Sequence, residues 1–207
     1  EKSLNRDVKL MNDANCFTLS EAIDGAGKDF KSVFGIIIGT GFGGGLSYKK
    51  EIIEGANQIA GDWGHQPLPY PTIEETKTQI SCPSNNCGRT LCAEQFMSGI
   101  GFADIFNKKN NTNFNSHEIV ELDLKNDPRA NLEFNLYEDR MARLMAVMIG
   151  VFDPDAIILG GGMSNIDRLY KNIPSLLPKY TFSNKVKTKI LKNIHGDSSG
   201  VRGAAWL

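Results

Sequence analysis

The stretch GIIIGTGFGGGLSYKKEIIEG, residues 35–55, decides the fold of this chain. Gly39, Gly41 and Gly44 fit the spacing G-x-G-x-x-G of a dinucleotide-binding turn, and an apolar run leads into them. Such a turn requires a helix directly after its glycines, because the pyrophosphate lies on the helix N-terminus. The residues that follow predict instead a β-hairpin with its turn near residues 49–50. We therefore expect a strand, a glycine turn and a second strand.

The glycine turn leaves two interpretations open. It lacks the G-K-[ST] ending of a Walker A loop, but its backbone N–H groups can still hold phosphate oxygens, and Thr40 adds a hydroxyl donor. The alternative is a tight hairpin turn that binds no ligand. A second glycine turn, residues 160–162, also follows an apolar strand. It either lets a flat base approach the backbone closely or is an ordinary strand-to-helix turn.

Composition and charge exclude several classes of protein. The 207 residues permit one domain or two small ones, and 41% hydrophobic with 23% charged residues is typical of a soluble globular protein. A net charge of -1 does not favour bulk binding of nucleic acid or of a membrane surface. The apolar runs are too short to span a bilayer, and the polar opening, residues 1–10, is no signal peptide. We expect a cytoplasmic protein without membrane or nucleic-acid partners.

Strands and helices alternate along the chain, which predicts the α/β class. Strands are expected at 7–11, 32–40, in a hairpin over 43–56, and at 155–162 and 185–193. Helices are expected at 12–27, 92–109, within 111–127, at 127–154, and at 165–180 with an interruption at Pro174. Residues 57–91 are predicted to be irregular, and 196–207 a loop that opens a helix. The chain has no initiator Met, so we expect it to start within a longer protein.

Three of the four cysteines lie within eleven residues. With one histidine they give the pattern His65-x16-Cys82-x4-Cys87-x4-Cys92. One His and three Cys suit a closed tetrahedral zinc site, and in a cytosolic chain such a cluster favours a metal over disulfides. The alternative is a set of buried free thiols. Cys16 has no evident base beside it and is interpreted as a packing residue.

Six motifs occur in a fixed order: LMNDANCFTLSEA, IIIGTGFGGG, AGDWGH, CGRTLCAE, DPDAIILGGGMSN and HGDSSGVRGAAWL. Together they resemble the ROK family of sugar kinases and repressors, and the resemblance covers nearly the whole chain. The phrases NDANC, GHQPLP, GGGMSNIDRLY and HGDSSGVRGAAWL are most similar to the bacterial fructokinase (manno-fructokinase) branch.

The resemblance implies a fold of two α/β lobes of the actin/hexokinase-like (ribonuclease H-like) ATPase type. Sugar lies in the cleft between the lobes, and ATP lies against the glycine turns. Such proteins begin with a D-x-G-G-T phosphate loop, which this sequence lacks. We therefore expect residues 1–12 to end the first lobe, 13–195 to form the second lobe with a zinc loop at 65–92, and 196–207 to begin a helix that returns to the first lobe.

The resemblance also assigns roles in catalysis and sugar binding. It implies that Asp13 is the general base, with a plain helix N-cap as the alternative, and that Asn12 binds a sugar hydroxyl unless it only forms a turn. Asp62 stands where the family pattern G-E-x-G-H has Glu, so its shorter carboxylate reaches the sugar less directly or through water. His65 is implied to bind both sugar and metal. Glu94 is implied to bind sugar hydroxyls, with a solvated helix glutamate as the alternative.

The family pattern around the metal is C-x-C-G-x-x-G-C-x-E. Cys87, Gly88, Cys92 and Glu94 match it, but Cys82 lies five residues before Cys87 instead of two. Cys82 can serve as the first thiolate only if PSNN, residues 83–86, is a loop insertion. The implied zinc is structural and preorganises the sugar site. The residues implied to contact ATP are Thr40, Gly41 and Gly43 at the phosphates and Gly161, Gly162 and Gly200 near adenine and ribose.

These assignments predict an ATP- and Mg²⁺-dependent kinase acting on a hexose, with fructose as the first candidate, and a homodimer at full length. The same family includes sugar-responsive transcriptional repressors with a helix-turn-helix ahead of the lobes. The phrases similar to the kinase branch argue against that alternative, and the residues upstream of this sequence would decide it. A third possibility is a catalytically incomplete fragment, since the first phosphate loop is missing.

Overall fold

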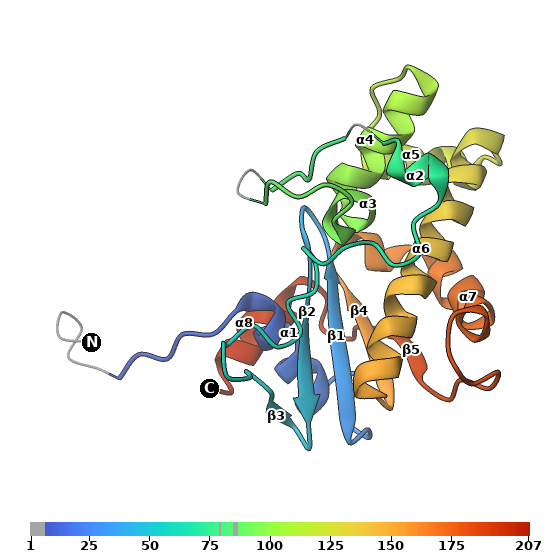
Figure 1. Ribbon diagram of the computed structural model, residues 1–207. Helices are drawn as coiled ribbons and strands as arrows, with labels where there is room; N and C mark the ends of the chain where they lie inside the picture. The colour runs from blue at the N-terminus through green and yellow to red at the C-terminus, as the bar shows by residue number, and fades with distance from the viewer. Residues whose placement is uncertain (1–6, 79, 85–86) are drawn as a thin grey trace.

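The computed structural model describes residues 7–78, 80–84 and 87–207 (Figure 1). A five-stranded mixed sheet with the order β3-β2-β1-β4-β5 forms its centre. β2 is antiparallel to β1 and β3, whereas β4 is parallel to β1 and β5. The strands are β1 (Ser32–Ile38), β2 (Phe42–Tyr48), β3 (Glu51–Ile52), β4 (Ala156–Gly160) and β5 (Lys189–Lys192).

Eight α-helices and three short 3₁₀ turns surround this sheet in the described part of the chain. The helices are α1 (Asp13–Ile23), α2 (Ile73–Thr76), α3 (Ala93–Met97), α4 (Gly99–Asn110), α5 (Ser116–Leu124), α6 (Pro128–Phe152), α7 (Asp167–Leu176) and α8 (Ser199–Ala204). The 3₁₀ turns are η1 (Gly162–Asn165), η2 (Leu177–Lys179) and η3 (Gly196–Ser198). None of these helices is both long and apolar enough to cross a membrane.

The hairpin predicted from the glycine-rich stretch is confirmed. β2 begins at Phe42, directly after the glycine turn, and pairs with β1 along its whole length. Lys49 and Lys50 form the next turn with φ of 54° and 66°, the two positive values of a turn that fits the twist of a hairpin. No helix follows the glycines, so the stretch is not a dinucleotide-binding turn.

The two faces of β1 explain the two layers of helices. Phe34, Ile36 and Ile38 alternate along the strand and are buried in the main core. That core also contains Phe96 of α3, aromatic residues of α4 and α6, and Leu169 of α7. Val33 faces the other way, into a smaller cluster around Phe17 of α1. Accordingly α1 and α8 lie on one side of the sheet and α6 on the other (Figure 1).

α8 is tied to α1 through one buried carboxylate. Glu21 accepts hydrogen bonds from the Ser199 hydroxyl at 2.8 Å and from the backbone N–H of His195 at 3.3 Å. Asp24 pairs with His195 at 2.9 Å and also with Arg202. The last helix therefore rests on the helix that begins with Asp13, although nearly the whole chain separates them.

Three expectations about secondary structure were wrong. Residues 7–11 form no strand, and Leu10 is 92% exposed, because no described strand lies beside them to share hydrogen bonds. The helix expected at 92–109 is two helices, because Ser98 has extended angles and its side chain caps α4 at the N–H of Gly101. α7 continues through Pro174 and ends two residues later, at Leu176.

The other boundaries differ less. The segment 57–91, expected to be irregular, contains the single helical turn α2. Asn12, Asn115 and Asp127 cap α1, α5 and α6, as their side chains accept hydrogen bonds from the first backbone N–H groups of each helix. Of the proposed first-lobe segment 1–12, residues 1–6 lie outside the described chain, as do residues 85 and 86 of the proposed insertion.

Candidate functional site

Segments from four parts of the sequence meet at the glycine turn between β1 and β2. The N–H of Gly99, at the start of α4, donates to the Gly39 carbonyl at 2.8 Å. A Cβ on Gly64 would lie 1.8 Å from the Phe42 carbonyl oxygen, so only glycine permits this approach of the two backbones. The start of α1 packs on β2, since a Cβ on Gly43 would lie 4.0 Å from that of Ala14. The turn is therefore the centre of the site.

Glu94 lies at this meeting point, in the first turn of α3. The residue is only 7% exposed, and its Oε2 accepts a hydrogen bond from the N–H of Phe42 at 3.2 Å. Its Oε1 lies 3.5 Å from the Cys82 sulfur. The Glu94 backbone N–H donates to the Gly64 carbonyl at 2.7 Å. The interpretation of Glu94 as a solvated helix glutamate is therefore excluded.

Asn12 and Asp13 lie at the exposed start of α1. The Asn12 side-chain oxygen accepts from the N–H groups of Ala14 at 2.8 Å and Asn15 at 3.4 Å, so Asn12 is the N-cap. Asp13 Oδ1 accepts from the N–H of Ala14 at 2.8 Å, and its side chain is open to solvent. Asp62 is also exposed. All three side chains are thus accessible to a ligand.

Trp63 is a residue of this site whose role the sequence did not indicate. Its indole stacks on Phe42 with ring centroids 5.2 Å apart and meets the edge of Phe34 at 4.8 Å. The buried indole fixes the segment 61–65, so that Asp62 and His65 are presented from an anchored chain. An aromatic residue between two glycines, in GDWGH, was the available signal.

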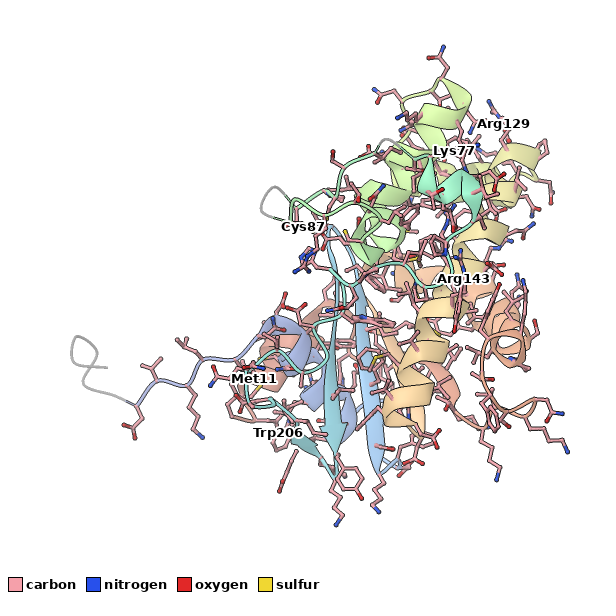
Figure 2. The ribbon with its side chains drawn as sticks, in the orientation of Figure 1. Met11, Lys77, Cys87, Arg129, Arg143 and Trp206 are labelled. Carbon is pink, nitrogen blue, oxygen red and sulfur yellow. The ribbon has the colours of Figure 1, made fainter. Side chains whose placement is uncertain are left out.

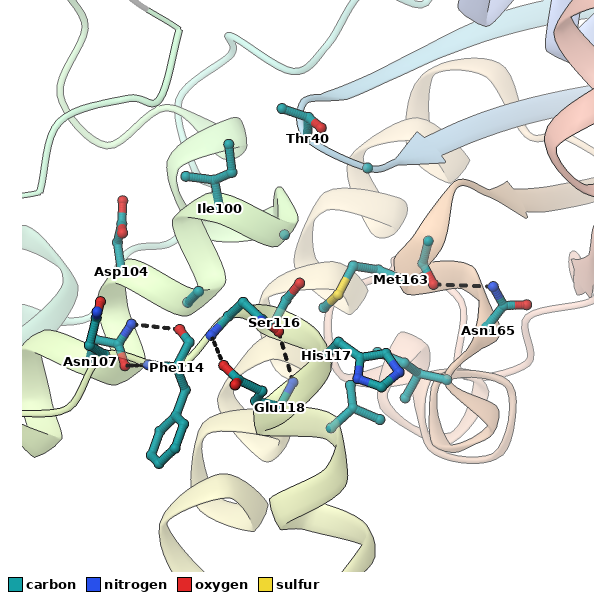
Figure 3. A pocket seen from close by; sticks show the side chains of 18 residues that line it. Thr40, Ile100, Asp104, Asn107, Phe114, Ser116, His117, Glu118, Met163 and Asn165 are labelled. Atoms are coloured by element: carbon teal, nitrogen blue, oxygen red, sulfur yellow. Dashed lines mark hydrogen bonds between the residues drawn. The ribbon is translucent and has the colours of Figure 1, made fainter.

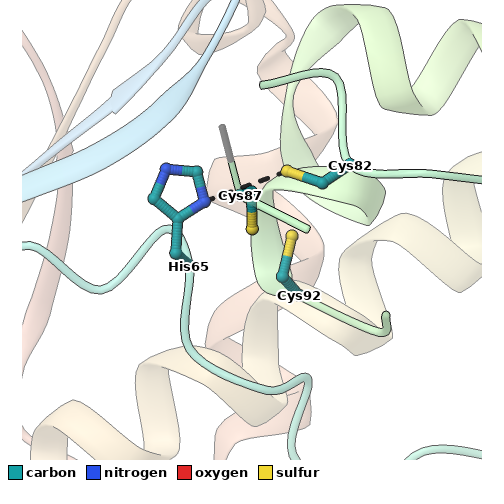
Figure 4. A group of neighbouring side chains, drawn as sticks. All are labelled: His65, Cys82, Cys87 and Cys92. Atoms are coloured by element: carbon teal, nitrogen blue, oxygen red, sulfur yellow. Dashed lines mark hydrogen bonds between the residues drawn. The ribbon is translucent and has the colours of Figure 1, made fainter. Parts of the chain in front are cut away.

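The four residues predicted to bind metal come together (Figure 4). Their ligand atoms all lie within 4.8 Å of one another, and the His65 Nδ1 is 3.8 Å from the Cys82 sulfur. A tetrahedral zinc ion with zinc–sulfur bonds of about 2.3 Å separates its sulfur ligands by roughly 3.8 Å. The geometry and the donor set therefore fit zinc.

Burial raises the pKa of the thiols of Cys82 and Cys92, and Cys92 is 1% exposed. A divalent cation that binds here would displace these protons and compensate the buried thiolates. None of the four cysteines of the chain is in a disulfide.

A pocket of about 990 Å³ opens beside the glycine turn (Figure 3). Thr40 and Gly162 line it where the two glycine turns approach each other. Its other walls come from α4, with Asp104 and Asn107, and from the start of α5, residues 115–118. A space of this volume with mixed polar and apolar walls is large enough for a nucleotide. Sequence reasoning did not predict the walls from α4 and α5.

The six residues implied to contact ATP lie in different places. Thr40 and Gly162 line the pocket, and Gly41 and Gly43 continue from the turn into β2. Gly161 has φ of +80°, and a Cβ there would lie 2.5 Å from the Ile38 carbonyl oxygen, so its bare face packs on β1. Gly200 belongs to α8 and is not among the residues that line the pocket.

Comparison with known proteins identifies the class. The model of the ROK family matches residues 1–207, and the chain belongs to that family. Two relatives are the N-acetyl-D-glucosamine kinases of Vibrio atlanticus (strain LGP32) and Vibrio cholerae serotype O1. Each is 38% identical over 210 residues, which covers 100% of this chain and 68% of the relative. Neither carries the name fructokinase, so they do not support the fructokinase branch.

Solved structures confirm the hexokinase-like fold. The ROK hexokinase from Thermus thermophilus superposes with a TM-score of 0.85 at 23% identity, over 99% of this chain and 66% of that one. The ROK family glucokinase from Streptomyces griseus gives 0.82 at 24% identity, over 99% and 69%. A ROK family transcriptional regulator gives 0.80 at 19% identity, over 99% and 52%. The fold alone therefore does not separate kinases from repressors.

Proposed function

We propose that this chain is the larger part of an ATP-dependent sugar kinase that phosphorylates a hexose. One observation carries the proposal. The start of α1, which begins with Asp13, and the buried Glu94 both pack beside the glycine turn, and this turn lines a pocket of nucleotide size. The 38% identity to two kinases of an amino sugar, over the whole chain, supports the same activity.

Asp13 would act as the general base. One of its oxygens is occupied by the Ala14 N–H, which leaves the other oxygen free to accept a proton. As the sugar hydroxyl attacks the γ-phosphorus of ATP, this oxygen takes the hydroxyl proton and ADP leaves. The first turn of α1 stabilises the negative charge of the carboxylate through the helix dipole.

Glu94, Asp62, His65 and Asn12 would hold the sugar hydroxyls around that base. The relatives make N-acetyl-D-glucosamine the first candidate for the sugar. Fructose is the second candidate and rests on the phrases NDANC, GHQPLP and GGGMSNIDRLY. One substituent separates such sugars, and pocket contacts to it decide between them.

ATP would lie between the two glycine turns, with its phosphates on the side of Thr40, Gly41 and Gly43. Backbone N–H groups and the Thr40 hydroxyl are the donors that phosphate oxygens require. Mg²⁺ would arrive with the nucleotide and neutralise its phosphate charge. The adenine ring of ATP would occupy the part of the pocket between α4 and α5.

Zinc would be held by His65, Cys82, Cys87 and Cys92. When bound, it supplies a fixed cross-link between loops and takes no part in phosphoryl transfer. His65 follows the segment of Asp62, and Cys92 lies two residues before Glu94, so the cross-link orients two groups proposed to bind sugar.

The test is a coupled ADP-release assay with Mg-ATP and a panel of hexoses. It is run on the longest form of the protein that its gene encodes, because the chain spans 68% of its relatives. Turnover with N-acetyl-D-glucosamine or fructose supports the kinase and names the sugar. Silence with every sugar, from folded and zinc-loaded protein, would overturn the proposal.

A sugar-responsive repressor is the second candidate, because the fold matches a ROK transcriptional regulator. It has less support, since the relatives at 38% identity carry kinase names. Sugar-dependent binding to operator DNA without ADP release would favour it. The expected homodimer and cytoplasmic location remain predictions, which light scattering and cell fractionation test.

A further inference from the structure

One segment connects two ligands of the cysteine cluster. We call residues 66–78 the strap, because they follow His65 and lead toward Cys82. The strap contains α2 and runs from the cysteine cluster to the long helix α6 and back (Figure 1). Different interactions hold its first half, residues 66–68, and its second half, residues 69–78.

Backbone hydrogen bonds hold the first half. The N–H of Leu68 donates to the Leu91 carbonyl at 2.8 Å, and the N–H of Ala93 donates to the Gln66 carbonyl at 2.8 Å. Both bonds join backbone atoms, so they hold His65 near Cys92 without the help of side-chain contacts. A change in the rest of the strap would leave this pair in place.

A buried carboxylate holds the second half. Glu75 of α2 is 4% exposed, and its Oε1 accepts from Arg140 Nε at 2.8 Å and from Arg143 Nη2 at 2.7 Å. Its Oε2 accepts from Arg143 Nη1 at 3.0 Å and from the N–H of Thr72 at 2.8 Å. Every side of the carboxylate is thus engaged, as a buried charge requires.

Arg143 also binds the strap backbone. Figure 2 labels Arg143 on α6. Its Nη1 donates to the carbonyls of Pro69 at 2.9 Å and Tyr70 at 2.7 Å. The Arg143 guanidinium on α6 therefore binds the strap at two places, at the backbone carbonyls before α2 and at the Glu75 carboxylate within α2. The planar fork of arginine makes this possible, whereas a lysine ammonium has no such geometry.

Ion pairs with residues of α6 and α4 hold the two arginines in place. Arg140 Nη1 pairs with Glu133 at 2.9 Å, and Glu133 pairs with Lys109 at 2.7 Å. Arg143 Nε lies 3.1 Å from Asp139. Glu133 does not belong to the strap, so this end of the network can be changed separately from Glu75.

We propose that Glu75 is a positioning residue for the metal centre. Through Arg140 and Arg143 it fixes the second half of the strap, and so brings the Cys82 thiolate to the other three ligands. The inference rests on the proposed zinc centre. Cys82 lies only seven residues after Glu75. Because this connection is short, the position of α2 limits where the Cys82 thiolate can lie.

The experiment is a cobalt(II) titration of the metal-free protein, in the longest form that its gene encodes, followed by absorption spectroscopy. Thiolate ligands give cobalt intense charge-transfer bands, so the absorption per cobalt reports how many thiolates bind. Wild type is expected to bind one cobalt with three thiolates. Glu75→Gln is expected to bind cobalt 10- to 100-fold more weakly, with lower absorption per cobalt, because Cys82 no longer reaches the ion.

Glu133→Gln is the matched control, because it removes a carboxylate from the same network without touching the strap. It is expected to keep the wild-type spectrum and affinity. Equal losses in both variants, or no loss in Glu75→Gln, would overturn the inference. If wild type itself binds no cobalt, the zinc centre fails and the inference with it.

Arg143→Lys keeps the test decisive if Glu75→Gln does not fold, as judged by circular dichroism. It preserves the positive charge but loses the fork that reaches Glu75 and the two carbonyls. We expect a weaker cobalt affinity with reduced thiolate absorption. An unchanged titration of this variant would also overturn the inference.

Discussion

The carboxylate of Glu94 accepts a hydrogen bond from the backbone N–H of Phe42, at 3.2 Å, across 52 residues of sequence. Phe42 begins β2 directly after the glycine turn, and Glu94 lies two residues after the cysteine Cys92. This bond therefore joins the element proposed to hold phosphates to the element proposed to hold sugar and zinc. In the proposed kinase, the alignment of the two substrates would depend on it.

Substituting Glu94 tests that alignment. Glu94→Gln keeps the volume but removes the charge, and hydrogen bonds to charged groups contribute about 1.5–3 kcal/mol. We expect the KM for the sugar to rise roughly 10- to 100-fold, with a smaller effect on the KM for ATP. Steady-state kinetics measure both constants. Glu121→Gln, at an exposed site on α5, should leave both constants unchanged, and a normal sugar KM in Glu94→Gln would remove Glu94 from the sugar site.

Asp13→Asn tests the general base. An amide cannot accept the hydroxyl proton, so kcat should fall by about 10²- to 10⁴-fold while sugar binding persists. Calorimetric titration with sugar and single-turnover kinetics separate the two effects. Asp29→Asn, at another exposed aspartate, serves as the control. Normal turnover by Asp13→Asn would show that another group takes the proton.

Removal of the metal should destabilise the protein. A chelator is expected to lower the melting temperature, because the cross-link among His65 and the three cysteines is lost. Cys87→Ser should bind less than one zinc per chain and melt at the temperature of the chelated protein. Cys16→Ser, outside the cluster, should keep one zinc. Metal analysis and differential scanning fluorimetry measure both, and an unchanged zinc content in Cys87→Ser would contradict the assignment.

Glu75 makes stability depend on acidity. Burial opposes its charge, but hydrogen bonds from Arg143 and Arg140 outweigh burial and lower its pKa from 4.5 to about 2. A lowered pKa stabilises the fold above the pKa of the unfolded chain, and the contribution disappears as pH falls from about 4.5 to about 2. The contribution is about 3 kcal/mol at neutral pH.

Urea unfolding of wild type and Glu75→Gln, from pH 7 to pH 2.5 with chelator present, measures this contribution. The chelator ensures that loss of metal does not enter the comparison. The difference in the free energy of unfolding should be constant above pH 5 and shrink below it. A difference that stays constant to pH 2.5 would assign the effect to packing instead of charge.

Two neighbouring glycines provide a matched pair. Gly161→Ala places a Cβ 2.5 Å from the Ile38 carbonyl oxygen at φ of +80°, so it should destabilise the fold by about 2 kcal/mol or more. Gly162→Ala meets nothing within 4 Å and should melt within a few degrees of wild type. Thermal unfolding compares them. Equal melting temperatures would show that the two glycine turns need not pack together.

The sequence predicted much of the fold because its signals are local. β-branched residues in 32–40, the glycines after them and the turn at 49–50 gave the first two strands without knowledge of their neighbours. The same reasoning failed at 92–109, where helical periodicity continues across Ser98 but the side chain of that residue starts a second helix. It also failed at 7–11, because a strand needs a neighbour that the pattern cannot supply.

The sequence by itself determined the types of residue that the site contains: one histidine and three cysteines, the carboxylates and the two glycine turns. Only the tertiary structure decided which of them share a space. It buried Glu94 against Phe42, packed the bare face of Gly161 on β1, and placed Glu75 between two arginines of α6. The physical reason is that hydrogen bonds and burial depend on distance in space, and the sheet brings together residues that lie tens of positions apart in the chain.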